Sequence, residues 1–325
     1  MRGLDPRALR PGNQAAGRPP GVKASGGPVR AAGLQAQVHV PRRLDTANPA
    51  PLLCILHGCM QDPATFAAAT LMNDAADRHG FLVVYPGQDR DNNPQGCWNW
   101  FLPENQHRDA GEPAAIAAIV SQLIDDRFAT LIDRRRVFVA GLSSGGAMAA
   151  ILAVCYPDLF AAVAVHSGLA YRSATTARAA FEAMQRGPGN TDVSGQVAHA
   201  AMGTRARPIP TMVIHGSDDS TVAPVNATQL LRQSMDANRL AAPELGQLDP
   251  GHPTRSWRER SDGGRPYTRS QWLDGSGALI HELLIVDGLG HAWSGGAGGG
   301  SYADPRGPAA SDAILGFFIQ ASLSS

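Results

Sequence analysis

The sequence predicts an α/β protein with a doubly wound, mostly parallel sheet and helices on both faces. Six short stretches are continuously apolar, which is typical of strands covered by helices on both sides. They span residues 52–56, 81–85, 137–140, 161–165, 212–214 and 283–286. Helical periodicity is found at residues 64–79, 112–128, 144–155, 227–238 and 309–321. Strands that alternate with helices in this order favour crossover connections and a parallel sheet.

The length of 325 residues and a hydrophobic content of 43% suit one domain with a large core. Residues 1–30 are rich in Arg, Pro, Gly and Ala, so we expect a flexible tail there and a single domain over residues 31–325. Residues 34–40 alternate in polarity like an edge strand. Residues 171–208 and 241–277 interrupt the pattern. We expect both to be insertions over the carboxyl edge of the sheet that shape a cleft.

Charge and composition exclude several classes of partner. Lys and Arg together number 28, as do Asp and Glu, so no positive excess is available for nucleic acid or an anionic membrane. No apolar run approaches the roughly 20 residues of a membrane-spanning helix. The first residues lack the apolar segment of a signal peptide, which predicts a cytoplasmic protein by default, with export as the alternative. The four cysteines lack the spacing of a zinc site.

A candidate nucleophile lies where an apolar strand meets an Ala-rich helix. Residues 141–145 read Gly-Leu-Ser-Ser-Gly and follow the predicted strand 137–140. This order of strand, sharp turn and helix is the setting of a nucleophile elbow, in which flanking glycines relieve crowding. Ser143 is therefore the predicted nucleophile. Ser144 is the alternative, but the register of the glycines favours Ser143.

Two backbone N–H groups are candidates for binding an oxyanion. The N–H of the residue after the nucleophile, Ser144, is one donor expected at such an elbow. The second should come from the loop after an early strand, where residues 57–61 read His-Gly-Cys-Met-Gln. Gly58 permits close approach of the backbone, which leaves the N–H of Cys59, or that of Met60, to face the oxyanion. We expect His57 to be a structural residue under this loop.

An acid and a base follow later strands in the order that such hydrolases require. Asp219 lies in a polar loop after the strand 212–214 and is the predicted acid, with Asp218 as the alternative. His291 lies in a Gly-rich loop after the strand 283–286, where an imidazole can reach both a serine and a carboxylate. Ser143, Asp219 and His291 thus form a predicted catalytic triad.

From about residue 51 to the C-terminus, the chain resembles α/β-hydrolase esterases of the poly(3-hydroxybutyrate) depolymerase type, which are related to feruloyl esterases. Besides the elbow, the resemblance rests on residues 57–62, 85–86, 97–101, 166–168, 215–216 and 290–296. It implies an α/β-hydrolase fold and the same three triad residues. It also implies a disulfide between Cys59 and Cys97 beside the oxyanion loop, for which two buried free thiols are the alternative. Cys54 and Cys155 are expected to be core residues.

Three tryptophans are candidate substrate contacts. Trp293 follows the His291 loop, and Trp98 and Trp100 lie in the segment implied to be anchored by the disulfide. Aromatic side chains at such places can stack against extended, apolar substrates. Packing in the core is the alternative for each of the three.

These residues together predict a serine esterase that forms an acyl-enzyme intermediate and needs neither a metal nor an organic cofactor. The resemblance favours esters of hydroxyalkanoate oligomers or polyester as substrates. Feruloyl or acetyl esters of carbohydrate are the alternative. A peptidase is less favoured by the sequence, and a noncatalytic binding protein with a degenerate site is the alternative from another class.

Overall fold

The computed structural model describes residues 27–45, 47–189, 191–262 and 264–323. Most of the predicted tail, residues 1–26, lies outside the described residues. Residues 29 and 30, which the sequence analysis assigned to the tail, belong instead to the first strand, β1 (Val29–Ala31).

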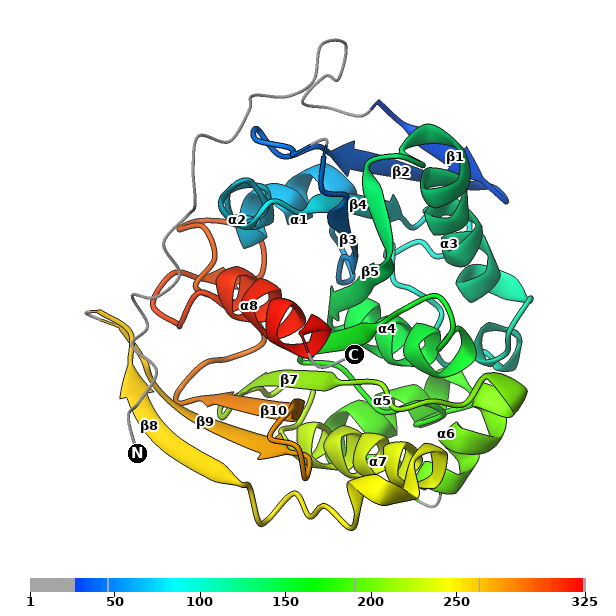
Figure 1. The fold of residues 1–325 in the computed structure, drawn as a ribbon. Coiled ribbons are helices and arrows are strands. Elements are labelled where there is room, and N and C mark those ends of the chain that lie inside the picture. Colours follow the sequence, from blue (N-terminus) through cyan, green and yellow to red (C-terminus); the bar gives the residue numbers. More distant parts are fainter. Residues whose placement is uncertain (1–26, 46, 190, 263, 324–325) are drawn as a thin grey trace.

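Ten strands of the described chain form one sheet, in the order β1-β2-β4-β3-β5-β6-β7-β10-β9-β8 (Figure 1). The bounds of the remaining nine strands are β2 Leu34–His39, β3 Ala50–Leu56, β4 Leu82–Gly87, β5 Ile132–Leu142, β6 Ala162–His166, β7 Thr211–Gly216, β8 Arg255–Arg260, β9 Pro266–Leu273 and β10 Leu279–Val286. A separate parallel pair joins β11 (Trp293–Ser294) to β12 (Ala303–Asp304). The six predicted apolar strands correspond to β3, β4, β5, β6, β7 and β10.

The centre of the sheet is parallel and its edges are antiparallel. Each neighbouring pair from β4 through β3, β5, β6 and β7 to β10 is parallel. On one edge β2 pairs antiparallel with both β1 and β4, and on the other edge β9 pairs antiparallel with β10 and β8. Because the parallel strands all end on one side, the loops after β3, β5, β7 and β10 meet there.

Helices cover both faces of this sheet, as the sequence predicts. One apolar cluster joins the sheet to α1 (Pro63–Thr70), α2 (Met72–His79) and α8 (Ala310–Ser322). The other joins it to α3, α4, α5, α6 and α7. These five helices span Gly111–Gln122, Ser144–Cys155, Ala177–Arg186, Gly195–Met202 and Val225–Ala241. The doubly wound α/β prediction is confirmed.

Two predicted helices are interrupted. The stretch 64–79 breaks at Leu71, whose φ of 54° is left-handed, and α2 starts at the next residue. Ala69 in the last turn of α1 accepts a hydrogen bond at 2.8 Å from the N–H of Ala297, so a distant loop contacts the helix at the break. The stretch 112–128 continues beyond α3 as a π-helical turn, Leu123–Arg127.

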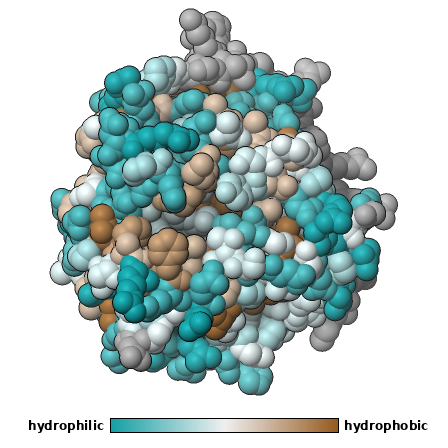
Figure 2. Space-filling view, turned by 180° about the vertical axis from the view of Figure 1, so that it is seen from behind, coloured by the Kyte–Doolittle hydropathy of each residue, from teal (hydrophilic) through white to brown (hydrophobic). Residues whose placement is uncertain are grey.

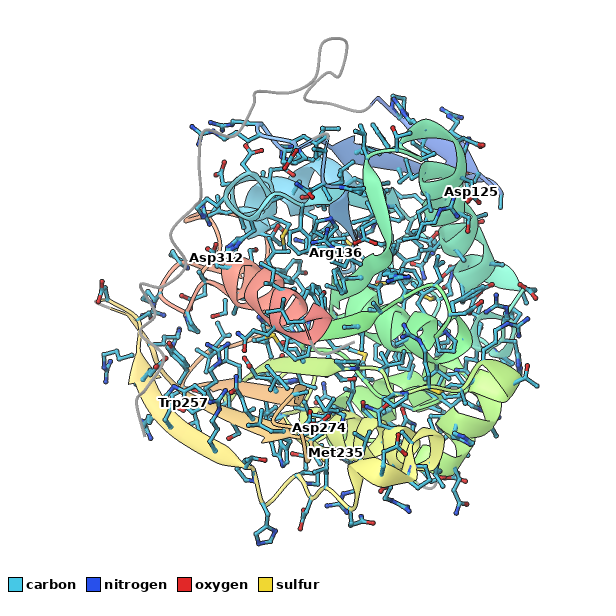
Figure 3. All side chains as sticks on the ribbon, in the orientation of Figure 1. Asp125, Arg136, Met235, Trp257, Asp274 and Asp312 are labelled. Atoms are coloured by element: carbon cyan, nitrogen blue, oxygen red, sulfur yellow. A yellow bond between two sulfur atoms is a disulfide. The ribbon has the colours of Figure 1, made fainter. Side chains whose placement is uncertain are left out.

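The expectation for residues 241–277 is wrong. They do not cover the carboxyl edge of the sheet but supply β8 and β9, which extend the sheet beyond β10. Figure 3 shows Trp257 on β8, at the margin of the molecule. Residues 171–208 form α5 and α6, and α5 borders the loop after β7: the amide of Gln185 donates to the carbonyl of Ser220 at 3.2 Å.

Few large apolar side chains reach the surface. Among the described residues six are exposed, namely Met60, Leu71, Phe181, Val225, Tyr302 and Leu323. On the face drawn in Figure 2, apolar residues appear in small groups among hydrophilic ones. None of the helices that the structure describes has both the length and the apolar character needed to cross a membrane.

Candidate active site

Ser143 occupies a sharp turn between β5 and α4. Its backbone has φ 59° and ψ −120°, a conformation that costs an L-residue about 1–3 kcal/mol. The turn is possible only because two residues lack side chains: a Cβ on Gly141 would lie 2.2 Å from the carbonyl oxygen of Gly145, and a Cβ on Gly145 would lie 2.3 Å from that of Leu56. The N–H of Ser143 donates to the carbonyl of His166 at 3.0 Å.

The structure brings the three predicted triad side chains into one hydrogen-bonded chain. Oγ of Ser143 lies 2.9 Å from Nε2 of His291, and Nδ1 of His291 lies 2.8 Å from Oδ2 of Asp219. A carboxylate can only accept, so Nδ1 carries the proton and Nε2 is left to accept from the serine hydroxyl. This is the tautomer that a general base requires.

Asp219 is buried and well supplied with hydrogen-bond donors. Its other oxygen, Oδ1, accepts from the N–H groups of Thr221 at 3.0 Å and Val222 at 2.8 Å. Burial alone would raise the pKa of Asp219, but His291 and the N–H of Val222 hold it below its ordinary value. The ionised carboxylate is therefore favoured. Asp218, the alternative acid, is exposed and accepts from the hydroxyl of Ser217 instead.

Two backbone N–H groups beside Ser143 have no acceptor among the described residues, those of Cys59 and Ser144. The sequence left Met60 as an alternative to Cys59. The N–H of Met60 is engaged, because it donates to the carbonyl of Gln95 at 2.7 Å. The geometry thus leaves Cys59 and Ser144 as the available donors for an oxyanion.

Two buried histidines lie behind the triad, and the sequence indicated no role for either. His166 stacks on Trp293 and its Nε2 accepts from the N–H of Ser294 at 3.1 Å. Burial, with His215 and His291 nearby, lowers the pKa of His166 to about 3, so its ring is neutral. Nε2 of His215 donates to the carbonyl of Val222 at 2.8 Å and so supports the Asp219 loop.

The three tryptophans are packed in the core rather than available to a substrate, which corrects the predicted contacts. Trp98 and Trp293 are 0% exposed and Trp100 is 5% exposed. The indole N–H of Trp98 donates to the carbonyl of His57 at 3.1 Å, and that of Trp293 to the hydroxyl of Ser311 at 3.2 Å. Their indole rings instead pack beneath the loops that carry the candidate site residues.

Two other apolar side chains are exposed on loops that adjoin the candidate site residues Cys59 and His291. Met60, directly after Cys59, is 54% exposed, and Tyr302 is 44% exposed with its ring edge-on to that of His291, 6.3 Å between centroids. Both have left-handed backbones, with φ of 64° and 52°. The amide of Gln61 donates to the carbonyl of Ser301 at 2.9 Å and links the two loops. Tyr302 lies in a Gly-rich segment whose sequence carries no signal for this placement.

The structure contains the Cys59–Cys97 disulfide, which ties the candidate oxyanion loop to the segment before Trp98. The hydroxyl of Ser144 lies 3.5 Å from Sγ of Cys59, so this bond lies beside the nucleophile turn. Cys54 and Cys155 are free and buried, as predicted. No group of three or more His, Cys, Asp and Glu side chains in the described ranges could hold a metal ion.

Alkylation tests the disulfide. When the oxidised protein is unfolded in a denaturant that contains iodoacetamide, we expect two cysteines to be modified, the free Cys54 and Cys155. When the protein is reduced first, we expect all four cysteines to react. Intact mass spectrometry counts the adducts. Four adducts without reductant would contradict the bond. Reduction is also expected to destabilise the fold by about 2–4 kcal/mol, because the unfolded chain loses a crosslink.

The chain is similar to several esterases. Poly(3-hydroxyalkanoate) depolymerase C of Paucimonas lemoignei is 35% identical over 82% of this chain and 62% of its own length. Feruloyl esterase B of Thermothelomyces thermophilus is 31% identical over 79% of this chain and 88% of its own length. The chain therefore spans less than two thirds of the depolymerase but most of the feruloyl esterase.

A solved structure supports the fold. The acetyl xylan esterase from Aspergillus awamori matches with a TM-score of 0.63 over 82% of this chain and 93% of its own, at 21% identity. This likeness confirms the α/β-hydrolase architecture. The family model described as Esterase PHB depolymerase matches residues 40–244, the part that contains Cys59, Ser143 and Asp219. The chain belongs to the esterase PHB depolymerase family.

Proposed function

We propose that this protein is a serine esterase with Ser143 as nucleophile, His291 as general base and acid, and Asp219 as the group that orients His291. The observation that carries the proposal is the continuous hydrogen-bonded chain from Ser143 through His291 to Asp219. It occurs beside the N–H groups of Cys59 and Ser144, which have no acceptor in the described part of the chain and suit the binding of an oxyanion.

The mechanism is acyl transfer in two halves. Nε2 of His291 takes the hydroxyl proton as Oγ of Ser143 bonds to the ester carbonyl carbon, and the carbonyl oxygen becomes an oxyanion held by the N–H groups of Cys59 and Ser144. When the carbonyl re-forms, the alcohol leaves with the proton from His291. Water, deprotonated by His291, then attacks the acyl-enzyme and releases the acid and Ser143.

The substrate class we propose is esters of hydroxyalkanoate oligomers or polyester. The similarity to a poly(3-hydroxyalkanoate) depolymerase supports it. So do the exposed side chains of Met60 and Tyr302, which offer apolar contact to an aliphatic chain. Feruloyl esters of carbohydrate are the second candidate, because the chain covers 88% of feruloyl esterase B.

A fluorophosphonate probe tests the catalytic proposal, because it forms a covalent bond only with an activated serine. We expect one adduct per chain in the wild type, located on the peptide that contains Ser143. The measurement is intact mass followed by peptide mapping. If the probe does not label the wild-type protein, the catalytic proposal is contradicted and the noncatalytic binding protein is favoured instead.

A hydrolysis panel separates the two substrate classes. Purified protein is given 3-hydroxybutyrate oligomers, amorphous polyester, methyl ferulate and an acetylated xylan, and kcat/KM is compared. We expect the hydroxybutyrate oligomers to give the highest value. A higher kcat/KM for methyl ferulate or acetylated xylan would contradict the proposed substrate class but would leave the proposed mechanism unchanged.

The disulfide bears on where the protein works. Disulfides persist in oxidising compartments and are rare in the cytosol. The Cys59–Cys97 bond therefore supports the exported alternative over the cytoplasmic one.

A further inference from the structure

The strand β8 forms an open edge of the ten-stranded sheet, because within the described chain it pairs with β9 alone. Figure 3 shows its Trp257 at the margin of the molecule. The strand at the other edge, β1, has three residues, whereas β8 has six, of which five are exposed. An exposed edge strand presents backbone N–H and C=O groups that can pair with another strand.

The hydrogen bonds at the turn between β8 and β9 show which backbone groups face this edge. The N–H of Ser261 donates to the carbonyl of Arg265 at 3.3 Å, so these two residues form a hydrogen-bonded pair of the ladder. Such pairs alternate along antiparallel strands, so every second residue of β8 directs its N–H and C=O away from β9. The outward-facing residues are Ser256, Arg258 and Arg260.

Two charged side chains of β8, Arg255 and Glu259, have no ion-pair partner in the part of the chain that the structure describes. Arg258, in contrast, is paired with Asp287. Arg255 and Glu259 are both exposed, and they lie on the same face of the sheet as Trp257, one on each side of it. The open edge therefore carries two opposite charges that nothing in the same chain neutralises.

We infer that β8 is a dimerisation edge, which pairs antiparallel with β8 of a second copy of this chain about a two-fold axis at Trp257. In this register, Ser256 exchanges both backbone hydrogen bonds with Arg258 of the second copy. Arg255 lies opposite Glu259 of the second copy, and Glu259 lies opposite its Arg255. These are non-hydrogen-bonded pairs, in which opposing side chains are closest. The inference does not depend on the proposed esterase function.

Charge selects this register from its neighbours. An axis at Arg258 would place the two Arg258 side chains directly opposite each other, which is unfavourable. An axis at Ser256 would place Glu259 opposite Pro253, outside the strand, where it meets no cation. Of these three registers, the axis at Trp257 is the one that pairs both free charges, and it does so twice.

The symmetry of this dimer leaves the candidate active sites open. The two-fold axis is perpendicular to the sheet, so the strands of the second copy run in the reverse direction. The loops after β5, β7 and β10 of the two copies then face opposite ways. A single strand pair is a small interface, so we expect a dimer that dissociates on dilution and has the same turnover per chain as the monomer.

Sedimentation velocity of the full chain over a concentration series gives the Kd of the dimer. Ser256→Pro removes an outward-facing N–H but no bond to β9, and edge strands tolerate proline at such a position. We expect it to raise Kd at least about tenfold. Ser256→Thr keeps the N–H and is the matched control, with Kd expected within about threefold of the wild type. Melting temperature and kcat for p-nitrophenyl butyrate show that each variant keeps its fold and site.

Exchange of charge tests the register. Arg255→Glu places a second carboxylate opposite Glu259, and Glu259→Arg places a second guanidinium opposite Arg255. Each variant alone is expected to raise Kd at least about tenfold. In an equimolar mixture of the two variants, both pairs across the axis have opposite charges again, so we expect heterodimers. Native mass spectrometry distinguishes them from homodimers by mass.

Three outcomes overturn the inference. The first is a wild type that stays monomeric at every concentration. The second is a wild-type dimer that a folded Ser256→Pro does not weaken, which would place the interface elsewhere. The third is a mixture of Arg255→Glu and Glu259→Arg that contains no more dimer than either variant alone. The mixing experiment involves no proline, so it decides the inference even if Ser256→Pro does not fold.

Discussion

Ser143→Ala is expected to lower kcat by at least about 10⁴-fold while the protein stays folded. The substitution removes the only hydroxyl within hydrogen-bond distance of Nε2 of His291 among the described residues. It keeps the Cβ, so the turn between β5 and α4 gains no new contact. The measurements are kcat for p-nitrophenyl butyrate, labelling by the fluorophosphonate probe, and the melting temperature.

Ser144→Ala is the matched control for Ser143→Ala. The Ser144 hydroxyl lies near the disulfide sulfur of Cys59 rather than near His291, and its backbone N–H survives the substitution. We therefore expect Ser144→Ala to remain labelled by the probe. Labelling of Ser143→Ala together with loss of labelling in Ser144→Ala would assign the nucleophile to Ser144.

Asp219→Asn is expected to have the second largest effect, about a 10⁴-fold loss of kcat. An asparagine can turn its N–H₂ toward Nδ1 of His291, which would place the ring proton on Nε2. Nε2 then cannot accept the proton of Ser143. The N–H groups of Thr221 and Val222 can still bond to the amide oxygen, so the loop keeps its shape.

Asp218→Asn controls for the loss of a negative charge in the same loop. Asp218 is exposed and does not contact His291, so kcat should stay within about twofold of the wild type. Both variants are compared for kcat and melting temperature at pH 7–8. A larger loss in Asp218→Asn than in Asp219→Asn would reverse the assignment of the acid.

The sequence predicted the helices and strands whose apolar residues are also the ones that are buried in the structure. The strand before Ser143 and the helix after it form one apolar unit, and α4 has the predicted bounds because all of its residues are buried. Asp219 and His291 could be placed because each follows an apolar strand, and the ends of parallel strands meet at one edge.

Other features depend on contacts that sequence position does not reveal. No glycine or proline at Leu71 indicates the break between α1 and α2. The break lies where the N–H of Ala297, in a distant loop, bonds to the end of α1. The strand β8 has polar side chains on both faces, so it lacks the apolar run by which the central strands were recognised. Adjacency to His291 suggested an exposed Trp293, but burial is set by residues such as Ser311 that lie farther along the chain.

The close approach at Gly145 has a consequence for altering this protein. The start of α4 touches the end of β3 backbone to backbone, with no side chain between them. The backbones themselves therefore set how closely the turn that carries Ser143 approaches the end of β3. Varying the exposed Met60 and Tyr302 in a library is expected to change which esters are accepted, while this backbone contact stays in place.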